Sequence, residues 1–230
     1  AQGETQIGVV GAGLIGYGAL RAFRNASALV LLATPAFAEP LVVAAMGDSL
    51  TQGYGLELEE GFVPQMHAWL SGEGVDVQLI NAGVSGDTTA GGLSRAAWTL
   101  TPEVDVMIVA LGANDYLRGI DPMSVRANLT GILETAQAAD VDIMLVGLEV
   151  GSNYGPDYKA EFDTIYPDLA AEFETGYIPS WFAGLEDEEG RVLNSPEYFQ
   201  ADGIHPNAQG VARIVEGMGP LVASFLSDLN

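Results

Sequence analysis

Residues 41–50 read LVVAAMGDSL, in which an apolar run is followed by a glycine, an acid, a serine and a leucine. The length of this run and its adjacent valines are typical of a buried β-strand. Ser49 follows the predicted strand directly, at a place where a helix would begin. In open parallel sheets, ligands bind beyond the carboxyl ends of the strands. The run therefore predicts a strand at residues 41–45 and a candidate functional residue just after it.

The rest of the chain repeats this arrangement from Glu39 onward. Short apolar runs alternate with helical patterns, which is typical of parallel strands joined by crossover helices. We expect strands at residues 41–45, 77–81, 106–111, 143–148 and 177–179. We expect helices at residues 62–70, 88–98, 124–139, 158–173 and 207–226. The sequence thus predicts an α/β domain with a five-stranded parallel sheet over residues 39–230.

Three further polar segments stand at comparable places in this pattern. Asn81–Gly83 follows the second predicted strand, Gly112–Asp115 follows the third, and Asp202–Pro206 lies in the loop before the last helix. Hydrolysis of an ester by a serine needs a nucleophile, a base, a group that orients the base, and donors for the oxyanion. Together with Ser49, the three segments supply each of these groups.

The candidate nucleophile is Ser49, although a serine after a strand is more often a helix N-cap. The chain has two histidines, and His205 follows Asp202 by three residues on a loop bounded by glycine and proline. This spacing allows the carboxylate to contact one imidazole nitrogen while the other nitrogen faces the serine. His67 lies in an amphipathic helical pattern without an acid at a useful spacing. We interpret His67 as structural or surface-exposed.

Candidate oxyanion donors come from the same segments. Gly83 lies in a turn, where a missing Cβ lets a backbone N–H approach a substrate oxygen. Asn114 offers a side-chain amide after the third strand. With the Ser49 N–H, these two residues would form a three-donor oxyanion hole. Each residue is common in turns, so this prediction depends on their joint order.

The four segments resemble the signature blocks of the SGNH, or GDSL, hydrolases. Within that superfamily the chain is similar to the bacterial multifunctional thioesterase, lysophospholipase and arylesterase group. This narrower resemblance is supported by the segments Leu117–Gly119 and Asn153–Gly155. The resemblance implies a flavodoxin-like, three-layer α/β/α sandwich and neither cofactor nor metal. It also implies a catalytic triad and an oxyanion hole made from the residues already named: Ser49, Asp202 and His205, and Ser49, Gly83 and Asn114.

We therefore predict a monomeric serine esterase that hydrolyses short- to medium-chain acyl esters or thioesters through an acyl-enzyme. One alternative is a carbohydrate O-acetylesterase of the same superfamily, with Trp181 or Tyr198 stacking on the sugar. A second alternative is a non-catalytic ligand-binding module that kept the sheet. A third is a nucleotide-dependent oxidoreductase, because Gly11–Gly16 matches G-x-G-x-x-G. In that motif an acid about 20 residues further on binds the ribose. Here the first acid after the run is Glu39, and an apolar segment precedes it, so the match is poor.

The composition restricts the partners. The chain has 230 residues, of which 48% are hydrophobic, enough for one well-cored domain. Its formal net charge is −23 with only eight Lys plus Arg residues, whereas nucleic-acid binding requires clustered basic side chains. We expect no nucleic-acid partner. The acidic run Glu186–Glu189 reads as a solvated loop, with calcium binding as the alternative although EF-hand spacing is absent.

Residues 1–38 contain the parts of a secretory signal. Arg21 and Arg24 precede an uncharged apolar segment that ends in Ala36-Phe37-Ala38. Residues 1–20 are glycine-rich, lack basic residues and fit this pattern poorly. The apolar segment is shorter than the roughly 20 residues that span a bilayer. We therefore expect cleavage after Ala38, a periplasmic or secreted protein and no stable membrane anchor.

Overall fold

A computed structural model describes residues 39–229 of the chain. These residues form a five-stranded sheet in the order β2-β1-β3-β4-β5, and every neighbouring pair is parallel. The strands are β1 (Leu41–Gly47), β2 (Val77–Gly83), β3 (Val106–Ala110), β4 (Asp142–Val146) and β5 (Gly176–Ile178). The strand order reverses at β1, whose two neighbours are β2 and β3. The carboxyl end of β1 is therefore the switch point at which such sheets bind ligands.

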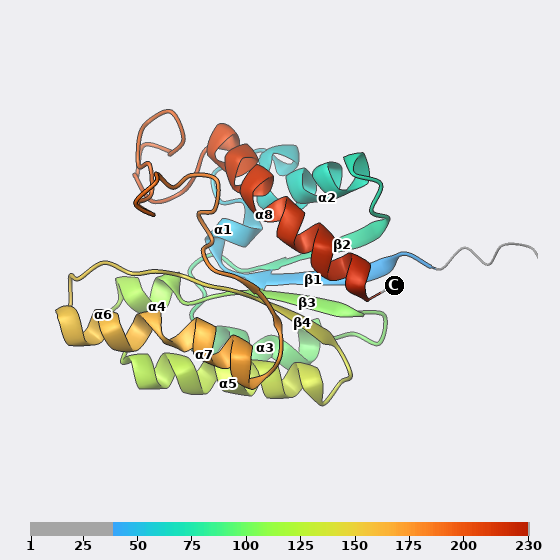
Figure 1. The fold of residues 1–230 in the computed structure, drawn as a ribbon, viewed down its shortest axis with the longest axis horizontal. Helices are drawn as coiled ribbons and strands as arrows, with labels where there is room; N and C mark the ends of the chain where they lie inside the picture. Colours follow the sequence, from blue (N-terminus) through green and yellow to red (C-terminus); the bar gives the residue numbers. More distant parts are fainter. Residues whose placement is uncertain (1–38, 230) are drawn as a thin grey trace, which may run out of the picture. The chain divides into compact units, whose positions relative to one another are not determined.

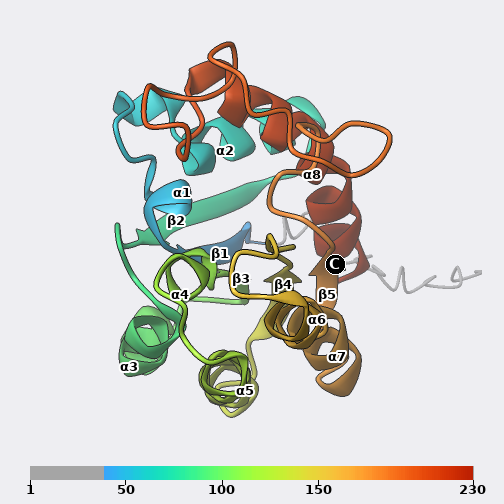
Figure 2. The ribbon, with the colours of Figure 1, turned by 90° about the vertical axis from the view of Figure 1, so that its left-hand side faces the viewer.

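Helices cover both faces of the sheet, which confirms the predicted three-layer α/β/α fold (Figures 1 and 2). One face carries α2 (Phe62–Gly72) and α8 (Ala208–Asp228). The other face carries α3 (Thr89–Thr99), α5 (Pro122–Gln137), α6 (Pro156–Asp163) and α7 (Ile165–Glu172). Three short elements lie in the connections: α1 (Ser49–Gln52), a 3₁₀ helix (Leu58–Glu60) and α4 (Ala113–Leu117).

Strand β1 contributes to the hydrophobic core on both faces. Val43 and Ala45 pack in the cluster under α2 and α8, whereas Ala44 and Met46 pack in the cluster under α3 and α5. All four side chains are buried. Successive strand residues point to opposite faces, so a strand covered on both sides is apolar at every position. This explains the continuous run in the sequence, and it fixes the loop after β1 to a rigid base.

The expected helix at residues 158–173 is wrong in one respect, because the structure has two helices there. α6 ends at Asp163 and α7 begins at Ile165. Pro167 has no N–H to donate to the carbonyl of Asp163, and its ring crowds that carbonyl. The chain therefore starts a new helix after Thr164. Helix α1 begins at Ser49, where the sequence indicated the start of a helix. Helix α4 was not expected, since five residues carry no readable helical period.

Some predictions lie outside the described residues. These are the Gly11–Gly16 run, the signal-like segment at residues 21–38 and the proposed cleavage after Ala38. Within residues 39–229, no helix is both long enough and apolar enough to cross a membrane.

Candidate active site

The loop after β1 presents Ser49 at the first position of α1. Asp48 caps this helix, since its Oδ1 accepts a hydrogen bond from the Leu50 N–H at 3.0 Å. Gly47 precedes the cap, and a Cβ there would collide with the side chain of Thr51. The glycine thus allows α1 to turn directly off the strand. The Ser49 side chain consequently lines a cleft at the carboxyl edge of the sheet.

The loop before α8 brings Asp202 and His205 to Ser49, as the sequence predicts. The Ser49 Oγ lies 2.9 Å from His205 Nε2, although 156 residues separate the two positions. On the other side of the ring, His205 Nδ1 lies 2.6 Å from Asp202 Oδ2. The ring of Tyr54 packs against the imidazole with centroids 4.6 Å apart. The three polar side chains therefore form one continuous hydrogen-bonded chain.

Asp202 is held in its ionised form. The imidazole of His205 and the N–H groups of Ile204 and His205 all hydrogen-bond to the carboxylate, and they lower its pKa to about 2. The imidazole contributes most to this shift. With the Nδ1 hydrogen donated to Asp202, Nε2 is left as the acceptor for the Ser49 hydroxyl. This is the arrangement required of a base that activates a serine.

The second histidine lies apart from this chain of hydrogen bonds. His67 is exposed on α2, the helix that packs on α8. The interpretation of His67 as a surface residue is confirmed by this exposure.

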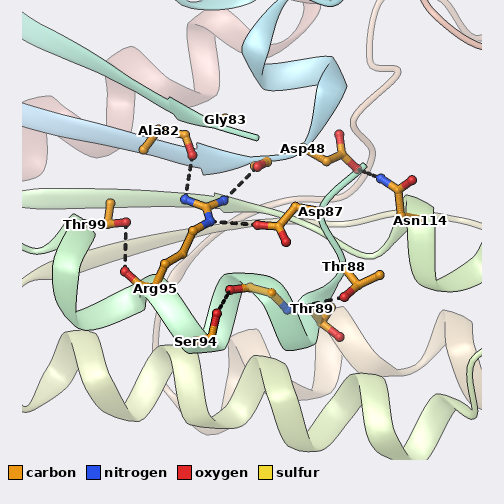
Figure 3. Close-up of polar contacts among 12 residues, drawn as sticks. Asp48, Ala82, Gly83, Asp87, Thr88, Thr89, Ser94, Arg95, Thr99 and Asn114 are labelled. Carbon is orange, nitrogen blue, oxygen red and sulfur yellow. Dashed lines mark hydrogen bonds and ion pairs between the residues drawn. The ribbon is translucent and has the colours of Figure 1, made fainter. Parts of the chain in front are cut away.

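Asn114 lies on α4 beside the loop after β1. Its Nδ2 donates a hydrogen bond to Asp48 Oδ2 at 3.1 Å (Figure 3). A primary amide has two hydrogens, so one N–H of Asn114 remains for another acceptor. Asn114 also lines the cleft that contains Ser49 and His205. The structure thus brings the predicted amide donor to the nucleophile, and it adds Asp48 as the partner that orients the amide.

Gly83 ends β2, and the structure adds a packing reason for a glycine at this position. A Cβ at this position would collide with the backbone of Gln52 in α1. The packing of β2 against α1 therefore requires a glycine here, whether or not a substrate oxygen approaches the backbone. Its N–H donates to the side chain of Asn81 at 3.0 Å. A substrate oxygen at this donor therefore has to replace the Asn81 carbonyl.

Asp48 is the residue of this site that the sequence analysis missed. It is 2% exposed, and burial raises its pKa to about 6 despite the hydrogen bonds from Leu50 and Asn114. No cation contacts it within residues 39–229. An acid directly after a fully apolar strand was the available signal, because such a position is buried by the neighbouring loops.

The cleft beside the triad has a volume of about 250 Å³. Its wall is largely apolar, with Glu149 as an acidic member. The apolar lining consists of Leu50, Leu117, Leu148, Val150, Phe182 and Ile204. Drug-sized ligands occupy pockets of roughly 300–1,000 Å³. The cleft therefore suits a small apolar group placed next to Ser49.

Trp181 does not take the role considered for it, whereas the acidic run lies in a loop as expected. Trp181 is 4% exposed and packs on Phe62 with ring centroids 4.6 Å apart, so it offers no face to a sugar. In the acidic run, Asp187 pairs with Arg191 and accepts the N–H of Glu189. Across residues 39–229, no cluster of three or more His, Cys, Asp or Glu side chains is arranged to hold a metal ion.

Comparison with known proteins identifies the family to which the chain is similar. The model of the GDSL-like Lipase/Acylhydrolase family matches residues 45–213. Esterase TesA of Pseudomonas aeruginosa is 36% identical over 200 residues, which cover 86% of this chain and 95% of that protein. Thioesterase 1/protease 1/lysophospholipase L1 of Escherichia coli K12 is 34% identical over 83% of this chain and 86% of that protein. The crystal structure of AlinE4, an SGNH-hydrolase family esterase, is 39% identical with a TM-score of 0.66, covering 81% and 97% of the two chains.

Proposed function

The chain belongs to the GDSL-like Lipase/Acylhydrolase family and is a serine esterase, and from that premise we propose that Ser49, His205 and Asp202 are its catalytic triad. The observation that carries this proposal is the hydrogen-bonded chain from the serine hydroxyl through the imidazole to the carboxylate, with contacts of 2.9 and 2.6 Å. The non-catalytic binding module is thereby set aside.

The proposed reaction has two halves. Ser49 Oγ attacks the acyl carbon while His205 Nε2 takes the hydroxyl proton, and Asp202 stabilises the imidazolium that forms. The resulting tetrahedral oxyanion collapses, the alcohol or thiol leaves with the proton from His205, and an acyl-enzyme remains. Water then attacks the acyl-enzyme with His205 again as base, which releases the acid and restores the serine.

Three donors are proposed to stabilise the oxyanion. The Ser49 N–H makes no hydrogen bond to any other described residue, and Asn114 has one N–H beyond the one it gives to Asp48. The Gly83 N–H must exchange its Asn81 partner. A neutral hydrogen bond of this kind contributes about 1 kcal/mol net, whereas a donor to a developing oxyanion contributes about 3 kcal/mol. The exchange therefore favours the transition state.

We infer that the substrates are esters or thioesters with short to medium acyl chains. The apolar cleft of about 250 Å³ beside Ser49 supports this inference. The relatives named esterase and thioesterase support it as well. An acetylated sugar is the less favoured substrate, because the burial of Trp181 removes one of the two expected stacking surfaces.

We also propose that the mature protein begins at Glu39, is a monomer and is located in the periplasm or outside the cell. Arg21, Arg24 and Ala36-Phe37-Ala38 support export. All three proposed catalytic side chains come from one chain, so activity does not require a second copy. Expression with residues 1–38 in a Gram-negative host should yield periplasmic protein that begins at Glu39. Cytoplasmic protein that retains residues 25–38 would overturn the export proposal.

Pre-steady-state kinetics test the proposed mechanism. A series of nitrophenyl esters of increasing chain length should give a burst of about one nitrophenol per chain, because the acyl-enzyme accumulates. Ser49→Ala should abolish the burst and the turnover. Ser85→Ala is the matched control, since Ser85 lies on the neighbouring loop and bonds to Gln52. If the burst survives in Ser49→Ala and is lost in Ser85→Ala, the nucleophile is Ser85 and the proposal is wrong.

A further inference from the structure

Arg95 lies on α3 and contacts the ends of two strands (Figure 3). Its Nη2 donates to the carbonyl of Gly47 at 2.9 Å, and its Nη1 donates to the carbonyl of Ala82 at 2.8 Å. Its Nε donates to Asp87 at 2.7 Å. The side chains of Arg95 and Asp87 are only 21% and 12% exposed. One planar guanidinium thus joins the carboxyl ends of β1 and β2.

These two carbonyls belong to the peptides that lead into the proposed oxyanion hole. The Ala82 carbonyl and the Gly83 N–H are opposite ends of one peptide unit. That unit is planar and trans, so the N–H points away from the carbonyl. An arginine that holds the carbonyl on one side therefore aims the Gly83 N–H toward the other side. In the same way, the Gly47 carbonyl fixes the peptide that precedes Asp48 and begins the turn to Ser49.

Helix α3 is itself anchored to the third donor. The N–H and the hydroxyl of Thr89, at the start of α3, donate to the carboxylate of Asp115 at 2.9 and 2.6 Å. Asp115 is fully buried and is the neighbour of Asn114 on α4. The same helix is thus bound to all three segments that supply proposed oxyanion donors.

We propose that Arg95 is a positioning residue for ester hydrolysis, which sets the direction of the Gly83 N–H and the path of the chain into Ser49. This inference rests on the proposed function and goes beyond it, because Arg95 does not reach the reacting atoms itself. An ordinary surface ion pair contributes little and controls no peptide plane. The contacts of Arg95 to two strand-end carbonyls distinguish it from such a pair.

Substitution of Arg95 should lower kcat and leave KM nearly unchanged, because the oxyanion exists only in the transition state. Arg95→Met should lower kcat by about 10²-fold, the loss expected when an oxyanion donor is misplaced. Arg95→Lys should lower kcat by roughly 10-fold, since one ammonium cannot replace a rigid fork with several donors. Arg126→Met is the matched control. Arg126 forms a 2.7 Å pair with Asp168 on the surface, and its loss should change kcat by less than about twofold.

Chemical rescue separates positioning from a merely structural role. Guanidinium ion, at concentrations well below those that unfold the protein, should raise the kcat of Arg95→Ala and leave Arg126→Ala unchanged. A kcat within about twofold of wild type in folded Arg95→Met would overturn the inference. A loss of kcat in Arg95→Ala that guanidinium does not restore would overturn it as well. If Arg95→Met does not fold, folded Arg95→Lys decides, and a wild-type kcat in that variant overturns the inference.

Labelling with a fluorophosphonate distinguishes this inference from the proposed function. The reagent forms a tetrahedral adduct, so its rate of reaction also depends on the oxyanion donors. Wild-type protein should be labelled at Ser49, and Arg95→Met should be labelled more slowly by about the factor seen in kcat. Absence of label at Ser49 in the wild type contradicts the proposed function. Labelling of Arg95→Met at the wild-type rate contradicts the positioning role alone.

Discussion

The loop after β1 and the loop before α8 each bring one carboxylate to Ser49, and the two carboxylates are in opposite environments. Asp48 is 2% exposed, and burial raises its pKa to about 6. The side chain of Asp202 is 37% exposed, and the bonds from His205 and two backbone N–H groups lower its pKa to about 2. Both acids lie within a few residues of the proposed nucleophile or base, but only Asp202 contacts an imidazole.

The difference shows how one chemical group serves two purposes. With a pKa of about 2, Asp202 is ionised at neutral pH, so it holds His205 with a full negative charge. Asp48 accepts hydrogen bonds from two neutral donors and forms no ion pair with any residue of the described range 39–229, so its charge is poorly compensated. The shift of its pKa from 3.8 to about 6 corresponds to about 3 kcal/mol of lost stability at pH 7. A buried charge that lowers stability at an active site indicates a functional role, and here Asp48 orients the amide of Asn114.

The largest expected effect comes from removing the charge of the exposed carboxylate. Asp202→Asn should lower kcat by about 10⁴-fold, because the amide no longer selects the imidazole tautomer that accepts the Ser49 proton. Asp187→Asn is the control, since Asp187 has a lowered pKa as well but pairs with Arg191 away from the site. Steady-state kinetics check both variants. Near wild-type turnover in Asp202→Asn would show that the exposed carboxylate does not orient the base.

Substitution of the buried carboxylate should have a smaller effect on activity and the opposite effect on stability. In Asp48→Asn, one of the two acceptor positions becomes an NH₂ group, which repels the amide of Asn114 unless that amide turns over. The proposed oxyanion donor is then misdirected, and kcat should fall by roughly 10²- to 10³-fold. Urea unfolding should show equal or higher stability. A variant that is both less stable and fully active would contradict the role given to Asp48.

The pH dependence of stability sharpens the same comparison. The folded-state pKa of Asp48 lies above its unfolded value of 3.8, so the native state binds the extra proton and gains stability as the pH falls from about 6 toward 4. Asp48→Asn carries no such charge. The stability of the variant relative to the wild type should therefore increase by roughly 2 to 3 kcal/mol between pH 4 and pH 7. A difference independent of pH would mean that Asp48 does not titrate in this window.

Substitution of His67, the histidine outside the site, should have the smallest effect, and His205→Ala is the contrasting variant. His205→Ala should remove most turnover, whereas His67→Ala should change kcat by less than about twofold and stability by less than about 0.5 kcal/mol, as is usual for exposed positions. Parallel assays of the two variants check this contrast. Similar losses from both substitutions would mean that the base is not assigned correctly.

Much of this arrangement was readable from the sequence because simple rules govern it. Strand β1 was expected at residues 41–45 and runs from Leu41 to Gly47. The rule that ligands bind at the carboxyl ends of parallel strands brought Ser49 and His205 together in the prediction. The break between α6 and α7 was missed although Pro167 was visible, because the apolar period continues across it.

The remaining features depend on tertiary packing that no local pattern encodes. The burial of Asp48 results from several loops meeting above β1, and the constraint on Gly83 comes from α1, about 30 residues earlier in the chain. Arg95 lies 48 residues from Gly47, to whose carbonyl it donates. These contacts join segments that only the complete sheet places side by side.

Mapping the site of covalent labelling is the most direct test of the central claim that Ser49 is the nucleophile of this esterase. Wild-type protein is treated with a fluorophosphonate, digested and analysed by mass spectrometry, with Ser49→Ala treated in parallel. The account predicts one adduct per chain, on the peptide that contains Ser49, and no adduct in the variant. An adduct on Ser85 or another serine, or full esterase activity without any adduct at Ser49, would contradict it.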